Sequence, residues 1–163
     1  MNLKKIKTNW FLGIPLIILL FAVVFFSYNS YSPVTGAAVE TKIQNVQIYS
    51  SAECSCCSSY SNYLESFGIE VKRNFVEDFS IKTQYDIPSS MYSCHTVIVE
   101  KYFVEGHVPI EIIEKLLNEQ PNITGIALPG MPQGAPGMGG YRTGPLQVYA
   151  ISRDGSVSLF ATI

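Results

Sequence analysis

The chain has 163 residues, a formal net charge of −2 and 47% hydrophobic residues. Its length is typical of a single domain, and much of the hydrophobic content lies near the N-terminus. The remainder is mildly acidic and has no basic stripe of the kind that binds nucleic acid, so we expect no nucleic-acid partner.

The N-terminal region predicts one membrane segment. Residues 10–26 form an apolar run without a charge, close to the lower limit of about 17 residues for crossing a bilayer. A lysine cluster precedes this run, and positively charged flanks stay in the cytoplasm. We therefore expect residues 1–9 to be a cytoplasmic basic tail and residues 10–27 a single-pass transmembrane anchor that leaves the rest of the chain extracytoplasmic.

Whether this segment is removed after export is a separate question. Gly36-Ala37-Ala38 resembles a cleavage site but lies well beyond the apolar run, so an anchored protein is the first expectation and an exported, cleaved protein is the alternative. Residues 28–41 are rich in Ser, Tyr, Asn, Pro and Gly without hydrophobic periodicity, which predicts a flexible linker. The folded domain is then residues 42–163.

Strands and helices alternate in the first half of this domain. Residues 46–49 read as a strand, and aromatic and aliphatic residues recur at helical spacing over residues 60–67, with Gly68 as a stop signal. Residues 69–75 predict a second strand, and a short, weakly helical piece follows over residues 78–85. This order is that of a β-α-β unit followed by a second helix.

The next elements extend this order to that of a thioredoxin-like domain. Residues 96–99 and 102–104 are two β-rich runs joined by a two-residue turn, which predicts a hairpin. Pro109 opens a helix that runs to residue 119, with an apolar stripe on one face. The expected fold class is thus α/β and thioredoxin-like, with the order β-α-β-α-β-β-α.

A second hairpin is expected at the C-terminal end. A short apolar run at residues 123–128 precedes a Gly- and Pro-rich loop at residues 129–144. Residues 146–152 and 156–162 then alternate around Asp154-Gly155, a strong hairpin signal. Which of the two hairpins takes the thioredoxin-like position, and which is an addition to the sheet, is left open.

The cysteines and histidines are the candidate functional residues. Cys54, Cys56 and Cys57 lie between the first strand and the first helix, where ligands gather in such folds. A thioredoxin-like placement brings Cys94 and His107 toward the same loop. We therefore expect these five residues to be metal ligands.

Three further residues are secondary candidates. His95 follows Cys94 directly, and in an extended strand their side chains would point to opposite faces unless the chain bends. His95 is therefore ranked after His107. Met131 and Met138 lie in the Gly- and Pro-rich loop, where a packing or lid role is favoured over ligation, although thioethers suit Cu(I).

The spacing of the thiols bears on the choice of metal. Soft thiolates select Cu(I), zinc or iron–sulfur clusters. We interpret the Cys-x-Cys-Cys stretch as lacking the two-residue gap of a zinc knuckle or thioredoxin-type pair, which favours bridging thiolates in a small polynuclear Cu(I) cluster over zinc or an iron–sulfur centre. Disulfides are the structural alternative. Cys56 is poorly placed to bridge Cys54 or Cys57, and we expect at most one of the three to reach Cys94.

Several spaced motifs point to a known family. They are the Cys-x-Cys-Cys stretch, Ser93-Cys94-His95-Thr96, VEGHVP at residues 104–109, and LPGMP at residues 128–132 with Gly137-Met138. This combination resembles the exported metal-binding proteins related to the copper-resistance protein CopG, over about residues 45–163. The resemblance implies a thioredoxin-like domain of the cell envelope that binds copper for copper tolerance. Cys54, Cys56, Cys57 and Cys94 match the thiols of this family.

The expected function is therefore an extracytoplasmic copper-binding protein. Its expected partners are copper ions, the membrane through the N-terminal helix, and a protein that delivers copper or exchanges electrons. Two other functions remain open: a thiol–disulfide oxidoreductase of the cell envelope, and a redox enzyme that interconverts Cu(I) and Cu(II). No catalytic residue is assigned, because the sequence contains no recognisable Ser/His/Asp set, phosphate-binding glycine loop or carboxylate pair.

Overall fold

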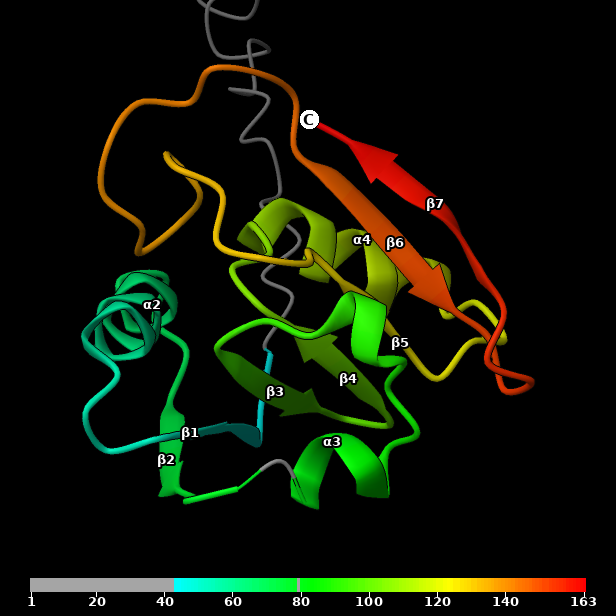
Figure 1. The fold of residues 1–163 in the computed structure, drawn as a ribbon, viewed down its shortest axis with the longest axis horizontal. Coiled ribbons are helices and arrows are strands. Elements are labelled where there is room, and N and C mark those ends of the chain that lie inside the picture. Colours follow the sequence, from blue (N-terminus) through cyan, green and yellow to red (C-terminus); the bar gives the residue numbers. More distant parts are fainter. Residues whose placement is uncertain (1–42, 79) are drawn as a thin grey trace, which may run out of the picture. The chain divides into compact units, whose positions relative to one another are not determined.

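The computed structural model of the chain describes residues 43–78 and 80–163, which form a seven-stranded mixed sheet with helices around it (Figure 1). In chain order the elements are β1 (Val46–Ser50), α2 (Ser55–Glu65), β2 (Val71–Phe75), α3 (Ser80–Gln84), the 3-10 helix η1 (Ser89–Met91), β3 (His95–Val99), β4 (Tyr102–Glu105), α4 (Ile110–Glu119), β5 (Gly125–Ala127), β6 (Gln147–Ile151) and β7 (Val157–Thr162). The mixed α/β class predicted from the sequence is confirmed.

The strands follow the order β2-β1-β3-β4-β5-β6-β7 across the sheet. β1 pairs in parallel with β2 and antiparallel with β3, and β3 and β4 form the first predicted hairpin. β5 joins β4 in parallel, and the second hairpin, β6 and β7, completes the far edge. The first hairpin is therefore the one that adjoins the β-α-β unit with the cysteines.

Two apolar layers cover the two faces of the sheet. Val97 of β3 belongs to the larger core cluster, which includes Leu64 of α2 and Leu116 of α4. The neighbouring Ile98 packs into the smaller cluster with Phe103 of β4. Because successive side chains of a strand point to opposite faces, α2 and α4 lie on one face, and the segment that contains η1 lies on the other.

Helix α4 shows how the sequence sets an element's bounds. Pro109 is its N-cap residue, and Ile113, Leu116 and Leu117 are buried, as the apolar stripe predicted. Gln120 ends the helix in the left-handed conformation, with φ of 46°, and its backbone N–H bonds the Leu116 carbonyl.

The predicted membrane anchor lies outside the described residues, as do the basic tail and the whole of the predicted linker. Within residues 43–78 and 80–163, no helix is both long enough and apolar enough to cross a bilayer.

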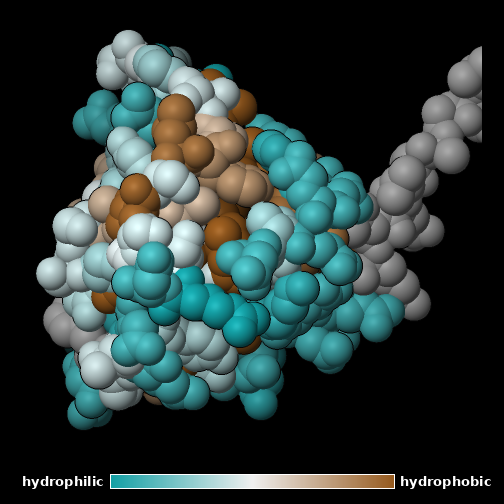
Figure 2. Space-filling view, turned by 90° about the vertical axis from the view of Figure 1, so that its right-hand side faces the viewer, coloured by the Kyte–Doolittle hydropathy of each residue, from teal (hydrophilic) through white to brown (hydrophobic). Residues whose placement is uncertain are grey.

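Large exposed apolar side chains are found on the two edge strands. They include Phe75 on β2, and Val157 and Leu159 on β7. Figure 2 shows the side of the molecule that lies on the right in Figure 1, with hydrophobic residues gathered among polar ones.

Candidate metal centre

The cysteine stretch lies at the junction between β1 and α2. β1 ends at Ser50, Cys54 is the N-cap residue of α2, and Cys56 and Cys57 lie in the first turn of this helix. The short loop thus presents all three sulfurs at one helix end, as the sequence predicted.

Cys54 and Cys57 form a disulfide, and their Cα atoms are 5.3 Å apart. This corrects our interpretation of the spacing, which considered Cys56 with its neighbours and overlooked the outer pair. Two residues separate Cys54 from Cys57, so the stretch does contain a C-x-x-C pair. Because residues three apart lie on one face of a helix, these two side chains meet within the first turn.

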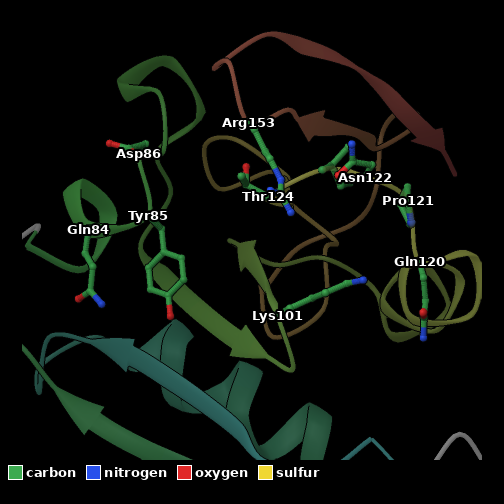
Figure 3. Close-up of a pocket in the computed structure, with 10 residues that line it drawn as sticks. Gln84, Tyr85, Asp86, Lys101, Gln120, Pro121, Asn122, Thr124 and Arg153 are labelled. Atoms are coloured by element: carbon green, nitrogen blue, oxygen red, sulfur yellow. The ribbon is translucent and has the colours of Figure 1, made fainter.

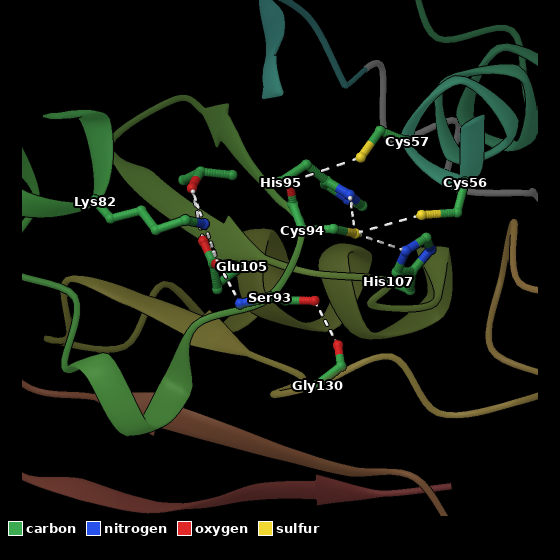
Figure 4. A network of polar contacts seen from close by, with 10 residues as sticks. Cys56, Cys57, Lys82, Ser93, Cys94, His95, Glu105, His107 and Gly130 are labelled. Carbon is green, nitrogen blue, oxygen red and sulfur yellow. Dashed lines mark hydrogen bonds and ion pairs between the residues drawn. The ribbon is translucent and has the colours of Figure 1, made fainter. Parts of the chain in front are cut away.

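The other two cysteines are free thiols next to this disulfide. The Cys56 sulfur lies 3.5 Å from the Cys54 sulfur and 3.7 Å from the Cys94 sulfur. All four sulfurs lie within 4.8 Å of one another. Figure 4 shows Cys56 and Cys57 reaching from α2 toward Cys94, at the start of β3. The predicted meeting of the two distant segments is therefore present in the fold.

His107 contacts the same sulfur with a defined nitrogen. Its Nε2 lies 3.0 Å from the Cys94 sulfur, and its Nδ1 lies 2.7 Å from the Pro136 carbonyl oxygen. A carbonyl only accepts hydrogen bonds, so Nδ1 carries the proton and donates it. Burial lowers the pKa of His107, which favours the neutral ring. In this tautomer Nε2 offers its lone pair toward Cys94, as a metal ligand must.

His95 also lies next to Cys94, and its ring contacts that of His107, with the two ring centroids 4.7 Å apart. Its Nδ1 lies 3.3 Å from the Cys94 sulfur, and its buried Nε2 has no hydrogen-bond partner among the described residues. Burial lowers the pKa of His95 well below its usual value, and nearby His107 and Lys82 act in the same direction. The chain bends at Cys94, just before β3, so the adjacent side chains do converge (Figure 4).

The two methionines occupy different surroundings. Met138 is half-buried and packs against the larger core cluster, whereas Met131 is 57% exposed. Packing is the role that the sequence favoured over ligation for both. Ligation by either methionine stays a prediction.

The chemistry of this donor set fits a soft metal ion. Burial raises the pKa of the Cys94 thiol to about 12, and the adjacent Cys56 acts in the same direction. At neutral pH this sulfur therefore keeps its proton unless a cation replaces it. Sulfur and neutral imidazole are donors that suit Cu(I) and zinc and disfavour hard cations. Reduced Cys54 and Cys57 would complete the set.

A buried ion pair lies beside the site and was missed in the sequence. Lys82 of α3 and Glu105 of β4 are 4% and 0% exposed, and the Lys82 ammonium contacts the Glu105 carboxylate. The Glu105 carboxylate also accepts hydrogen bonds from the Ser93 backbone N–H and the Thr96 hydroxyl, both at 2.6 Å. One signal in the sequence could have indicated this pair. Glu105 is a charged residue at the end of an otherwise apolar strand, just before Gly106-His107.

The Gly- and Pro-rich loop at residues 129–144 packs against the middle of α2. Gly137 has φ of 74°, and a Cβ at this position would lie 2.6 Å from the Tyr60 backbone nitrogen. The Ser93 hydroxyl donates to the Gly130 carbonyl oxygen at 2.5 Å. This path brings the Pro136 carbonyl to His107, and Figure 1 shows the loop arching over α2.

A pocket of about 500 Å³ lies elsewhere, between the end of α3, the β3–β4 turn and the β6–β7 turn. Lys101 and Arg153 line it, and Figure 3 shows Asp86 pointing away from its centre. None of its lining residues is a cysteine or a histidine. The candidate site is therefore identified by its sulfur and imidazole donors and not by the volume of this pocket.

The fold and the site together define a mixed α/β protein with a cysteine and histidine cluster that can hold a metal ion. Residues 91–138 match the family described as "Protein of unknown function, DUF411". This match includes Cys94, His95, His107 and Met138. No curated protein matches the chain.

Two solved structures are similar to this chain at the level of sequence and fold. "Copper resistance protein copG- Form 2" is 39% identical with a TM-score of 0.67, and the match covers 72% of this chain and 96% of that one. "Copper resistance protein copG- Form 1" is 38% identical with a TM-score of 0.68, and the match covers 74% and 98%. The chain belongs to the CopG family.

Proposed function

We propose that this chain binds copper in copper tolerance or homeostasis, with Cu(I) held by the thiolates of Cys54, Cys56, Cys57 and Cys94 and by His107. The observation that carries the proposal is the convergence of the four sulfurs within 4.8 Å. The printed names of the two similar structures, both copper resistance proteins, support copper as the metal. His95 is the second imidazole candidate.

The arrangement of the sulfurs supports more than one copper ion. Cys56 lies close to both the Cys54 and the Cys94 sulfur, and a thiolate between two others can bridge two soft cations. Bound copper would supply a cation able to change between Cu(I) and Cu(II). The residues of the chain supply the thiolates, the neutral imidazoles and a partly buried environment.

Copper binding by all four sulfurs requires a reduced site. Two electrons and two protons convert the Cys54–Cys57 disulfide to two thiols, and an external dithiol is a suitable donor of both. Metal binding then displaces thiol protons. The oxidised chain retains only Cys56 and Cys94 as free thiols, so it should bind less copper.

A thiol–disulfide oxidoreductase is the second candidate function. The disulfide supports it, because Cys54 and Cys57 form a C-x-x-C pair at the start of α2, a position at which thiol reactivity is raised in general. Disulfide exchange with a test substrate that persists in the presence of a copper chelator would favour this function over metal binding.

The location of the domain is also part of the proposal. We infer a thioredoxin-like domain outside the cytoplasm, held by the anchor at residues 10–27, with export and cleavage as the alternative. The parallel pairing of β1 with β2 and its antiparallel pairing with β3 support the thioredoxin-like interpretation. Protease accessibility of the domain in intact cells and in spheroplasts would test the location.

The central experiment is an anaerobic Cu(I) titration of the full-length chain. The reduced protein is titrated against a competing Cu(I) chelator, and its copper content is measured by elemental analysis. We expect a copper-to-protein ratio above one, and less copper in the oxidised protein. The Ser58→Ala variant is a control, because within residues 43–78 and 80–163 the hydroxyl of this exposed side chain bonds the Cys54 main-chain carbonyl alone and no sulfur. No competition for Cu(I) by the reduced chain would contradict the proposal.

A further inference from the structure

We propose that the buried Lys82–Glu105 ion pair is a positioning device that holds the bend at Cys94, so that this sulfur faces Cys56 and the histidines. The inference rests on the proposed function, because Cys94 is the ligand that it orients. Neither Lys82 nor Glu105 is a proposed metal ligand; both act through the backbone beside Cys94.

The contacts of the carboxylate lie on both sides of the bend. Glu105 accepts a hydrogen bond from the Ser93 N–H, before Cys94, and from the Thr96 hydroxyl, after His95. In an extended strand the Cys94 and His95 side chains would point to opposite faces. Here the Cys94 sulfur and His95 Nδ1 are 3.3 Å apart. One carboxylate therefore bonds the segment at two points, Ser93 and Thr96, and holds the bend between them.

Lys82 holds the carboxylate in this place. Its ammonium contacts Glu105 and donates to the Thr96 hydroxyl oxygen at 3.1 Å, from α3 on the other side of the segment (Figure 4). Lys82, Glu105 and Thr96 contact one another in the interior, and the partly buried Ser93 joins them through Glu105. These residues come from α3, β3, β4 and the turn before β3.

Stability alone does not explain a charged pair at this depth. Desolvation opposes burying two charges, and replacing a buried ion pair by apolar side chains is often neutral or stabilising. The Ser93 N–H supplies a more specific reason. Its hydrogen bond within the described part of the chain goes to Glu105, so loss of the carboxylate leaves this amide without its acceptor.

Gly106 allows this approach. It has φ of 79°, and a Cβ at this position would lie 2.7 Å from the Ser93 hydroxyl oxygen and 2.5 Å from the Leu128 carbonyl oxygen. Because no side chain intervenes, Ser93 reaches both Glu105 and, through its hydroxyl, the Gly130 carbonyl. The positioning device is thereby connected to the loop over the site.

Hydrogen exchange in the unsubstituted protein tests the device first. In the reduced, metal-free full-length chain, we expect the Ser93 amide to exchange slowly, as the amides of β3 do, although Ser93 lies outside the strand. Exchange at the rate of an exposed loop amide would overturn the proposal. This measurement requires no substitution and no copper.

A pair of double variants tests the role of the acceptor. Lys82→Met with Glu105→Leu removes both charges and the acceptor, whereas Lys82→Met with Glu105→Gln removes the charges and keeps a neutral acceptor of similar shape. Glu119→Gln in the exposed Lys115–Glu119 pair is the matched control. Circular dichroism establishes which variants fold.

The readout is specific to Cys94. In the metal-free reduced chains, we measure the iodoacetamide alkylation rate of Cys94 relative to Cys56, and then the Cu(I) affinity. The double variant with Glu105→Leu should change the alkylation ratio and weaken Cu(I) binding by about 10- to 100-fold, and the double variant with Glu105→Gln should recover part of both. An unchanged ratio with Glu105→Leu, or equal effects of the two double variants, would overturn the proposal.

The outcomes separate the two proposals. If the unsubstituted chain fails to bind copper, the proposed function fails, while Ser93 exchange and Cys94 alkylation still decide whether the ion pair positions Cys94. If copper binds with the expected affinity and the Ser93 amide is unprotected, the proposed function stands and the positioning role fails.

Discussion

The Cys94 sulfur lies 3.0 Å from His107 Nε2, although 13 positions separate the two residues in the sequence. The proton on Nδ1 is directed to the Pro136 carbonyl, so the unprotonated nitrogen is the one that faces the sulfur. The ring of His107 thus has the orientation that the proposed metal ligation requires.

Replacing His107 should weaken copper binding. We expect His107→Gln to lower the Cu(I) affinity of the reduced chain by about tenfold or more, because the amide cannot supply the neutral imidazole nitrogen that faces Cys94. Chelator competition measures this change. His95→Gln is the matched comparison and should have the smaller effect, since its nitrogen lies farther from the sulfur. A larger loss from His95→Gln would reverse this ranking.

Replacing Cys57 should affect both the metal site and the oxidised fold. We expect Cys57→Ser to lower copper content in the reduced chain and to lower the melting temperature of the oxidised chain, since it removes a ligand and the disulfide together.

The comparison with Cys56→Ser separates these two effects of Cys57. Cys56 is a free thiol, so its replacement should reduce copper content while leaving the melting temperature of the oxidised, metal-free chain nearly unchanged. Elemental analysis and thermal unfolding measure both properties. Full copper loading of Cys57→Ser would contradict the placement of this ligand.

Copper affinity should depend on pH. The pKa of the Cys94 thiol is raised to about 12 from an ordinary value of 9.0, so Cu(I) must displace its proton over the neutral range. The apparent affinity should therefore rise with pH by about tenfold per unit for each thiol proton displaced. Chelator competition at several pH values between about 6 and 9 gives this slope, and Cys94→Ser should reduce it by one proton.

The raised pKa of the Cys94 thiol also affects the stability of the metal-free reduced fold. Because the folded-state pKa lies above the unfolded value, the contribution of the Cys94 thiol is fully present below about pH 9 and is lost as the pH rises toward 12. Urea unfolding across this range should show a decrease that is smaller in Cys94→Ser. An identical decrease in both chains would exclude Cys94 as its source.

The loop over the site should respond sharply to one glycine. Gly137→Ala places a Cβ 2.6 Å from the Tyr60 backbone nitrogen, at a left-handed φ of 74°, and should lower the free energy of unfolding by about 1–3 kcal/mol. Gly139→Ala is the matched control, since a Cβ there meets nothing within 4 Å. Urea unfolding of both variants makes the comparison. Equal stability would show that the loop does not pack on α2 as described.

Local sequence patterns predicted much of this fold. The alternation of β-rich runs and helical spacing located the strands and α4, and the Asp154-Gly155 turn located the second hairpin. These features depend on residues close together in the chain, so they can be read from the sequence.

Features that depend on tertiary contacts were harder to predict from the sequence. The Lys82–Glu105 pair joins residues 23 positions apart, and no periodicity predicts that two charges will be buried together. The bend at Cys94 depends on the same pair. From the sequence we could therefore say only that the Cys94 and His95 side chains would converge if the chain bent there. The Cys54–Cys57 disulfide was within reach of the sequence, because its spacing is local, and was overlooked there.

The group that selects the His107 tautomer belongs to the main chain. Every amino acid carries the same carbonyl, so a change of side chain at position 136 leaves the acceptor itself in place. What matters is the route of the loop, and Gly134, Gly137 and Gly140 permit that route with φ values of 73°, 74° and 84°. Substitutions that reroute this backbone would thus alter how the imidazole is presented, even when they alter no ligand.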